Sequence, residues 1–204
     1  MESINQQVWK ALQTDTAVMR GMERDLINIR ALAKEIITKY ELKASLDAVI
    51  SSIRRFPLEA SKEEEETLRH IFRDSIVGTK NNVACITIKM QPSQVFAKIC
   101  AMNLPAIRMT TGTEEVKIIV ENAHADEVAK LFKKAEVEKG LSEINVTVSE
   151  KAVKTKGVLA RMAGELSIAN INMHELLVCP PEFLIYVSEK DIVKAHERII
   201  ALTS

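Results

Sequence analysis

The sequence is poor in glycine, poor in aromatic residues and without an excess of either charge. It has 6 glycines among 204 residues, 4% aromatic residues, and 28 Lys and Arg that balance 28 Asp and Glu. So few glycines leave little material for a phosphate-binding loop, and no Walker, GxGxxG or GxSxG motif is present. The balanced charge excludes a polybasic nucleic-acid tail, and the 47% of hydrophobic residues excludes a disordered chain.

Cysteines and long apolar runs are scarce as well. Cys85, Cys100 and Cys179 are odd in number and widely spaced, which fits neither a disulfide framework nor a zinc knuckle. No apolar run reaches the roughly 18 residues that a membrane-spanning helix needs. The N-terminal segment lacks the cationic start and apolar middle of a secretion signal. We therefore expect a soluble, cytoplasmic protein without a membrane partner.

Residues with catalytic or metal-binding potential are isolated. His174 and Glu175 begin like a zinc-protease helix, but Val178 stands where the second histidine should be. Cys85 lies beside core positions of a predicted strand, which indicates an inert buried thiol. Cys100 lies near the end of a predicted helix, and Cys179 precedes two prolines in a predicted turn. We expect no catalytic residues, no metal site, no cofactor and no enzymatic activity.

Up to about residue 74 the apolar residues recur at helical spacing. Asp15 and Ser45 stand where side chains that cap a helix N-terminus are expected. The pattern predicts helices at residues 3–12, 15–24, 28–40 and 45–56 and a fifth from residue 61.

The predicted helices at 28–40 and 45–56, joined by a polar turn, resemble a helix-turn-helix or winged-helix domain. In that family the second helix reads DNA, which implies contacts from Ser45, Asp47, Ser51, Ser52, Arg54 and Arg55, with Arg30 of the first helix as a further candidate. Six bases against three acids between residues 26 and 56 give a mild positive stripe. The alternative is a helical packing or dimerisation module, because residues 61–72 are helical and acidic where a wing hairpin would follow.

From residue 75 short runs of strand type alternate with helical ones. The pattern predicts strands at 82–90, 106–110, 115–121, 143–149, 174–179 and 183–188, and helices at 93–102, 125–137, 157–169 and 192–202. Asp191 is expected to cap the last of these helices. This order is one ferredoxin-like βαββαβ unit and most of a second. Either residues 75–80 supply the missing strand, or the two units share and exchange an edge. The predicted fold class is α+β, with a helical domain followed by two such units.

The predicted helix at 157–169 has distinctive ends. Gly157-Val158-Leu159 opens it and Asn170-Ile171-Asn172-Met173 leads into the next strand. This resembles the ACT domain, a small-molecule sensor of amino-acid metabolism, as found in pairs in the regulatory regions of aspartate kinases. Lys156 and Asn170 stand where that family usually has proline and glycine. Asparagine tolerates the left-handed conformation that such a glycine often adopts.

The resemblance implies a ligand site as well as a fold. In ACT pairs an amino acid lies between two units, held by backbone amides before one helix and by residues of the facing unit. The matching positions are Lys156, Gly157, Val158 and Leu159 at the loop and Asn170, Ile171 and Asn172 at the turn. The alternative is that Gly157 only starts a helix and Asn172 only caps a turn. The preceding unit resembles a degenerate ACT domain in order and length, without the motif.

Together these patterns predict a helical module at 1–74, a degenerate ACT-like unit at 75–142 and an ACT-like unit at 143–204. We expect an amino-acid-sensing, ligand-responsive transcription regulator that forms a homodimer or a higher oligomer, because edge strands pair readily. The alternative is an allosteric protein that regulates an amino-acid biosynthesis enzyme by direct contact. A small stand-alone enzyme ranks third, because the sequence supplies no catalytic trio.

Overall fold

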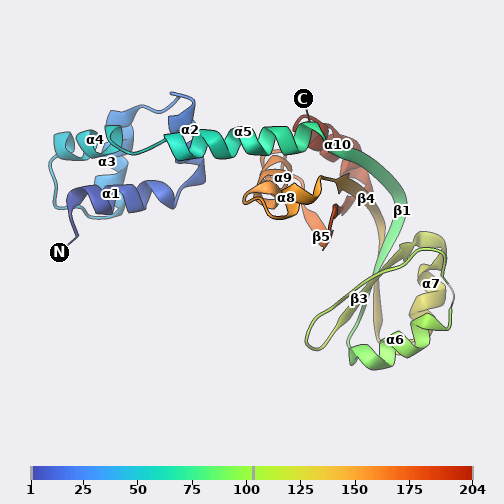
Figure 1. Cartoon of the computed structure of the whole chain (residues 1–204). Helices are drawn as coiled ribbons and strands as arrows, with labels where there is room; N and C mark the ends of the chain where they lie inside the picture. The colour runs from blue at the N-terminus through green and yellow to red at the C-terminus, as the bar shows by residue number, and fades with distance from the viewer. Residues whose placement is uncertain (1, 103, 204) are drawn as a thin grey trace. The chain divides into compact units, whose positions relative to one another are not determined.

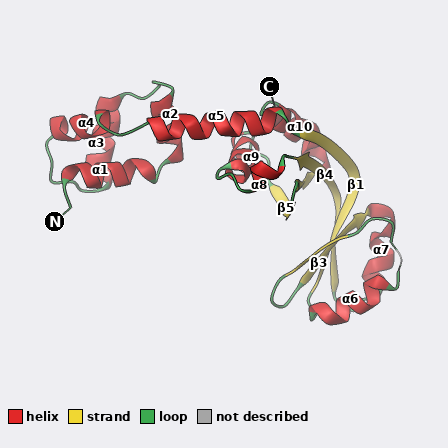
Figure 2. Cartoon of the chain, viewed as in Figure 1, coloured by secondary structure: helices red, strands yellow, loops and turns green. Residues whose placement is uncertain are grey.

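The computed structural model describes residues 2–102 and 104–203, without the side chains of residues 59–64. The chain forms two compact units, residues 1–67 and residues 68–204, with helix α5 (Glu59–Arg73) running across the boundary. Figure 1 traces the elements along the chain, and Figure 2 separates the all-helical unit from the unit that contains the strands. Among the described residues, no helix is long and apolar enough to cross a membrane.

The first unit is built from short capped helices: α1 (Ile4–Gln13), α2 (Thr16–Glu23), α3 (Ile29–Lys39), α4 (Leu46–Arg54) and the start of α5. An oxygen of the preceding side chain accepts backbone N–H bonds at each of the first four helices, from Ser3, Asp15, Asn28 and Ser45. The predicted caps at Asp15 and Ser45 are confirmed. Local sequence therefore sets where these helices begin.

The helices of the first unit close around one apolar core. Val8, Ala33 and Val49 are fully buried there, on α1, α3 and α4. The Trp9 indole N–H donates to the Ser52 carbonyl at 3.0 Å, and its ring meets Phe56 edge-on at 5.8 Å between centroids. These contacts tie α1 to the end of α4.

The second unit contains a six-stranded antiparallel sheet with strand order β2-β3-β1-β4-β6-β5. The strands are β1 (Ile76–Ile88), β2 (Arg108–Thr111), β3 (Val116–Glu121), β4 (Ala135–Thr147), β5 (Met173–Cys179) and β6 (Glu182–Ser188). The helices are α6 (Pro92–Cys100), α7 (Asn122–Lys130), α8 (Glu150–Val153), α9 (Val158–Ile168) and α10 (Ile192–Ile200), with a 3₁₀ turn at Glu189–Asp191.

Two long central strands serve both halves of this sheet. Residues 83–88 of β1 and 135–141 of β4, with β2, β3, α6 and α7, make the first sheet module. Residues 76–80 of β1 and 143–147 of β4, with β5, β6 and α8 to α10, make the second sheet module. Residues 76–80 thus supply the strand that was missing from the two predicted units. The two modules also share their central strands. The expected boundary at residue 142 lies inside the continuous strand β4.

Each shared strand carries one extra residue near its middle. The pairing shifts between Lys80 and Val83 and again between Val83 and Cys85. Asn82 and Gly140 lie at these points with φ of 58° and 77°, the left-handed conformation that a bulge residue often adopts. The two shifts have opposite sense, so the ladder recovers its original register beyond them.

The helices bury one apolar cluster in each module. Ile86, Ile118 and Val128 are fully buried in the first sheet module. Ile144, Met162 and Ile199 are fully buried in the second, where the last turns of α5 add Leu68, Ile71 and Phe72 to the cluster.

Three sequence-based predictions need correction. The predicted helix at 125–137 ends as α7 at Lys130, and Ala135 already begins β4. The helical spacing misled because Phe132 of the connecting turn and Ala135 at the start of β4 pack against the same core as α7. The predicted strand at 82–90 is the second half of β1. Asp191 precedes α10 but makes no side-chain cap bond.

Candidate functional site

The loop before α9 exposes backbone amides at the start of a helix. Gly157 is the N-cap with φ of 87°, and its carbonyl accepts the Arg161 N–H at 2.8 Å. A Cβ atom there would lie 3.3 Å from Leu68 Cδ1, so both conformation and space favour glycine. The first N–H groups of a helix have no partner within it and carry the positive end of the helix dipole. The loop therefore suits a carboxylate.

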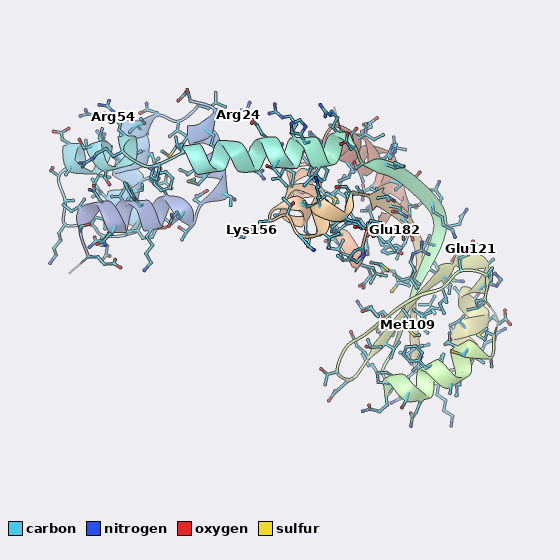
Figure 3. All side chains as sticks on the ribbon, in the orientation of Figure 1. Arg24, Arg54, Met109, Glu121, Lys156 and Glu182 are labelled. Atoms are coloured by element: carbon cyan, nitrogen blue, oxygen red, sulfur yellow. The ribbon has the colours of Figure 1, made fainter. Side chains whose placement is uncertain are left out.

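The side chains of this loop divide between surface and core. Lys156 is exposed at the entrance to α9 (Figure 3) and Leu159 is 40% exposed. The Val158 side chain is 2% exposed and belongs to the core of the second sheet module. Of the predicted residues, Val158 can therefore offer only its backbone to a ligand.

The turn after α9 forms an open hollow. Asn170 has φ of 56°, so the predicted left-handed asparagine is confirmed. The Ile171 N–H donates to the Leu166 carbonyl at 2.9 Å and closes the helix, while the Ile171 side chain is buried. A hollow of about 380 Å³ is lined by Ala163, Ser167, Asn170, Ile171, Asn172 and Met173.

The two halves of the predicted site lie at opposite ends of α9. The helix has 11 residues, which at about 1.5 Å per residue span about 16 Å. A single amino acid cannot reach from the Gly157 amides to the Asn172 side chain over that distance. Within one unit the loop and the turn therefore lie apart, and the expected ligand position between two facing units stays a prediction.

The equivalent helix of the first sheet module begins differently. α6 has Gln91 as N-cap without a side-chain bond, and Pro92 occupies its first turn. Proline has no backbone N–H, so this helix presents one amide fewer than α9 does. The first sheet module thus keeps the topology without the amide-rich loop.

The candidate DNA-contacting residues lie on the first unit. Arg30, Ser45, Ser51, Arg54 and Arg55 are exposed, and Arg54 is marked in Figure 3. The Arg55 guanidinium donates to the Ser51 carbonyl at 3.2 Å and to Asn5 Oδ1 at 3.3 Å.

Ser52 is a correction, because its side chain is fully buried. It faces the core of α1, α3 and α4, since residues 49, 52 and 53 share the inner side of α4. Ser52 cannot contact a partner in this structure.

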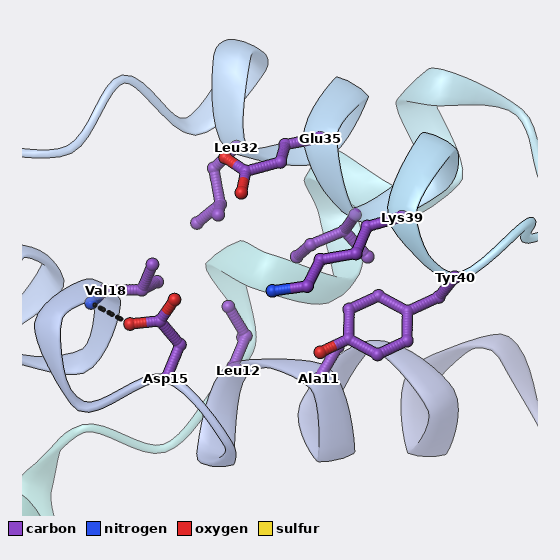
Figure 4. Close-up of a pocket in the computed structure, with 9 residues that line it drawn as sticks. Ala11, Leu12, Asp15, Val18, Leu32, Glu35, Lys39 and Tyr40 are labelled. Carbon is purple, nitrogen blue, oxygen red and sulfur yellow. Dashed lines mark hydrogen bonds between the residues drawn. The ribbon is translucent and has the colours of Figure 1, made fainter.

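A small cleft in the first unit is drawn in Figure 4. Its lining comes from α1, α2 and α3 and from the caps Asp15 and Tyr40, namely Ala11, Leu12, Asp15, Val18, Leu32, Glu35, Ile36, Lys39 and Tyr40. It encloses about 20 Å³, which is room for about one water molecule. The Asp15 carboxylate already accepts the Val18 N–H at 3.1 Å as a helix cap. The cleft is too small for a cofactor.

Reactive thiols and metal ligands are not gathered anywhere in the described part of the chain. No group of three or more His, Cys, Asp or Glu residues could hold a metal ion there. Cys85 is 3% exposed, and its burial, together with the charge of Glu175, raises the pKa of its thiol to about 11. This agrees with the inert thiol predicted from the sequence. Cys100 and Cys179 are exposed free thiols.

A polar cluster on the helix-free face of the sheet was not predicted from the amino-acid pattern. Arg108 Nη2 lies 3.2 Å from Glu143 Oε1, and the Tyr186 hydroxyl donates to Glu143 Oε2 at 2.6 Å. Burial and the hydrogen bond to Glu143 raise the pKa of Tyr186. Lys117 forms an ion pair with Glu175 on the same face. These partners come from different strands, and only the sheet register brings them together.

Comparison with known proteins gives a fold and no family. No protein-family model matches the chain, and no curated protein matches it. The regulatory subunit of aspartate kinase from Thermus thermophilus, in its ligand-free form, matches with a TM-score of 0.54 and 15% identity. That match covers 63% of this chain and 95% of the subunit. The second unit shares its fold with aspartate kinase regulatory domains.

Two further solved structures are similar to this chain. Aspartate kinase from Clostridium acetobutylicum matches with a TM-score of 0.55 and 16% identity over 63% of this chain. The match spans only 34% of that enzyme's length. A Vibrio cholerae protein of unknown function, described as a possible transport protein, matches with a TM-score of 0.51 and 15% identity over 68% of this chain and 98% of that protein. Identities this low establish the fold alone.

Proposed function

We propose that this chain is an amino-acid-sensing regulatory protein, in which the second unit binds the ligand and the first unit transmits its state. The observation that carries the proposal is Gly157, a left-handed glycine that opens α9 with unpartnered amides in a fold of aspartate kinase regulatory type. Such a loop holds a carboxylate without any cationic side chain. The division into modules at residues 74 and 142 stays a prediction.

The ligand site is proposed to form between two copies. The loop at Gly157 and the turn at Asn170 and Asn172 lie at opposite ends of α9. Two copies related by a two-fold axis beside α9 place the loop of one against the turn of the other. The exposure of Lys156, Asn170 and Asn172 supports this arrangement, since each is free to face a partner. A homodimer then carries two equivalent sites.

Ligand binding would change how the copies pair. A ligand shifts such an equilibrium only by the difference between its affinities for the two arrangements. Typical coupling changes the affinity of a second partner by about 5- to 150-fold. The helical units of the dimer would then be repositioned, and with them the surface that carries the output.

Two outputs remain in competition. A ligand-responsive transcription regulator uses the exposed Arg30, Ser45, Ser51, Arg54 and Arg55 against DNA. A regulator of an amino-acid biosynthesis enzyme uses protein contact instead, and the likeness to regulatory domains of aspartate kinases favours it. DNA binding that weakens steeply with salt supports the first, and co-purification with an enzyme in the absence of DNA binding supports the second.

The decisive experiment is a thermal-shift screen of the full chain against the twenty amino acids, followed by calorimetry of any hit. A ligand at about one hundred times its dissociation constant stabilises the fold by about 2.7 kcal/mol. We expect one amino acid, or a few related ones, to raise the melting temperature. A flat result with all twenty would contradict the proposal.

Three variants locate the site. Gly157→Asp places a negative charge where the ligand carboxylate is proposed, and we expect it to abolish binding. Gly157→Ala imposes a similar backbone strain without the charge and should keep measurable binding, so it is the matched control. Asn172→Ala tests the opposite half of the site and should weaken binding. Unchanged affinity in Gly157→Asp would show that the ligand lies elsewhere.

A further inference from the structure

The helix-free face of the sheet has a closed apolar centre. Val83, Cys85, Ile119, Leu141, Leu184 and Tyr186 are each at most 4% exposed and pack together. Every one of them comes from a strand, on β1, β3, β4 or β6. Within residues 2–102 and 104–203 no helix covers this face of the sheet, so other parts of the chain must shield these side chains from solvent.

Ion pairs between the two sheet modules provide that cover. Lys117 of β3 pairs with Glu175 of β5, and Arg108 of β2 pairs with Glu143 of β4 at 3.2 Å. The Tyr186 hydroxyl on β6 donates to the same Glu143 carboxylate, which is 4% exposed. Lys117 and Arg108 belong to the first sheet module, whereas Glu175 and Glu143 lie in the second. Both pairs therefore join one module to the other.

These contacts exist only because the sheet is strongly coiled. Strands β1, β4 and β6 separate β3 from β5 in the sheet. At about 4.8 Å per strand, β3 and β5 would lie about 19 Å apart in a flat sheet. The curvature that brings them together follows the course of β1 and β4 in Figure 1, and the bulges at Asn82 and Gly140 lie on these strands.

We propose that Lys117–Glu175 and Arg108–Glu143 form a clasp that opens and closes the helix-free face while the helix-covered cores stay folded. In the closed arrangement, the one in this structure, the clasp holds the outer strands over Cys85 and its neighbours. In the open arrangement both ion pairs separate, the sheet uncoils between its modules and solvent reaches the apolar centre. The clasp does not depend on any ligand, so it stands apart from the proposed amino-acid site.

Two features favour local opening over a static brace. A partly buried ion pair loses hydration that its attraction only partly restores, so closed and open arrangements can lie close in free energy. The apolar clusters under the helices are separate from the centre beneath the clasp. Separating the clasp therefore leaves both helix-covered cores intact.

Cys85 provides a direct reporter of opening. It lies in the apolar centre, 3% exposed, and the other two thiols are exposed. In a Cys100→Ser, Cys179→Ser background, the rate at which a disulfide reagent labels Cys85 at pH 8 measures how often the clasp opens. We expect Lys117→Met, which leaves Glu175 without its partner, to raise that rate about tenfold or more. Glu175→Gln and Arg108→Met should act in the same direction.

Two controls distinguish the clasp from general destabilisation. Lys89→Met removes an exposed ion pair between the residue that follows β1 and Glu136 of β4, within the first sheet module, and it should leave the labelling rate unchanged. Lys117→Glu combined with Glu175→Lys restores the pair with its charges exchanged and should return the rate toward that of the parent. The urea midpoint of each variant, followed by circular dichroism, reports global unfolding.

The results separate cleanly. Faster labelling in Lys117→Met that exceeds any loss of global stability, with recovery in the charge-exchanged variant, supports the clasp. Labelling at the parent rate in both Lys117→Met and Arg108→Met overturns it. Labelling that rises only in proportion to the shift of the urea midpoint also overturns it, because Cys85 would then be reached by global unfolding.

Discussion

The two sheet modules have one topology and two different helix entrances. α9 in the second begins at a left-handed glycine, and α6 in the first begins at a proline. Both sequences start a stable helix. At α6 the proline has no backbone N–H, whereas at α9 the first backbone N–H groups stay exposed. The comparison teaches that the fold does not need the glycine loop. This difference between the two entrances is the one expected if Gly157 has the ligand-binding role proposed above.

The strongest test of this comparison is whether the modules unfold together. Ile118→Ala empties a buried position in the first sheet module, and Ile185→Ala empties one in the second. Each should cost about 2–5 kcal/mol of unfolding free energy. Because β1 and β4 belong to both modules, either variant should lower the protection of α7 and α10 equally in native-state hydrogen exchange. Loss of protection confined to the mutated module would show that the shared strands do not couple them.

High pH should weaken the face where the modules meet. Cys85 has its pKa raised to about 11 in the folded chain, against an ordinary value of 9.0. An unfolded chain releases this proton first, so stability is full below about pH 9 and falls as the pH rises to about 11. The loss attributable to Cys85 is about 2–3 kcal/mol. Urea titrations at several pH values should show a flatter profile for Cys85→Ala; an unchanged slope would contradict the assignment.

The two left-handed glycines of the second unit allow a narrower comparison. Gly157→Ala and Gly140→Ala each place a side chain at positive φ, which costs about 1–2 kcal/mol. The new Cβ at position 157 also meets Leu68 at 3.3 Å, whereas position 140 is open. We expect Gly157→Ala to be the more destabilising in urea denaturation. The reverse order would mean that the bulge in β4 tolerates less change than the helix entrance.

The smallest expected effect concerns the entrance of α6. Pro92→Ala gives this helix the amide that it lacks and relaxes the unfolded chain, so stability should fall by about 0.5 kcal/mol. Calorimetry with any amino acid that binds the parent should show no additional site. Gain of a second site would indicate that the missing backbone N–H at position 92 is the only reason why α6 does not bind the ligand as α9 is proposed to do.

Local chemistry made much of this structure predictable. Asp15 and Ser45 cap the starts of α2 and α4, and Gly157 stands at the start of α9. Asn170 adopts the left-handed conformation because its short polar side chain tolerates it. Each of these features depends on neighbours within a few residues. The backbone of the loop at Gly157 and of the turn at Asn170 could therefore be predicted as local structure, whereas their role in ligand binding stays a prediction.

What escaped prediction depends on distant partners. The predicted strand began at residue 82, but pairing with β4 makes residues 76–88 one continuous strand with a bulge. The pair Lys117–Glu175 spans 58 residues and three intervening strands, so only register and coiling reveal it. Ser52 shares its spacing with core positions of α4, and that periodicity was the available signal that it points inward.

Synthesis of the chain meets the nested strands in a fixed order. Residues 76–80 leave the ribosome before the first sheet module, but their partners in β4, residues 143–147, follow more than sixty residues later. The first sheet module has all its strands once residue 141 has emerged, so it can form while the earlier segment is still unpaired. Residues 76–80 then stay unpaired, next to the folded first sheet module, until residues 143–147 of β4 have been synthesised. The nested order thus makes the first sheet module a template on which the second is assembled.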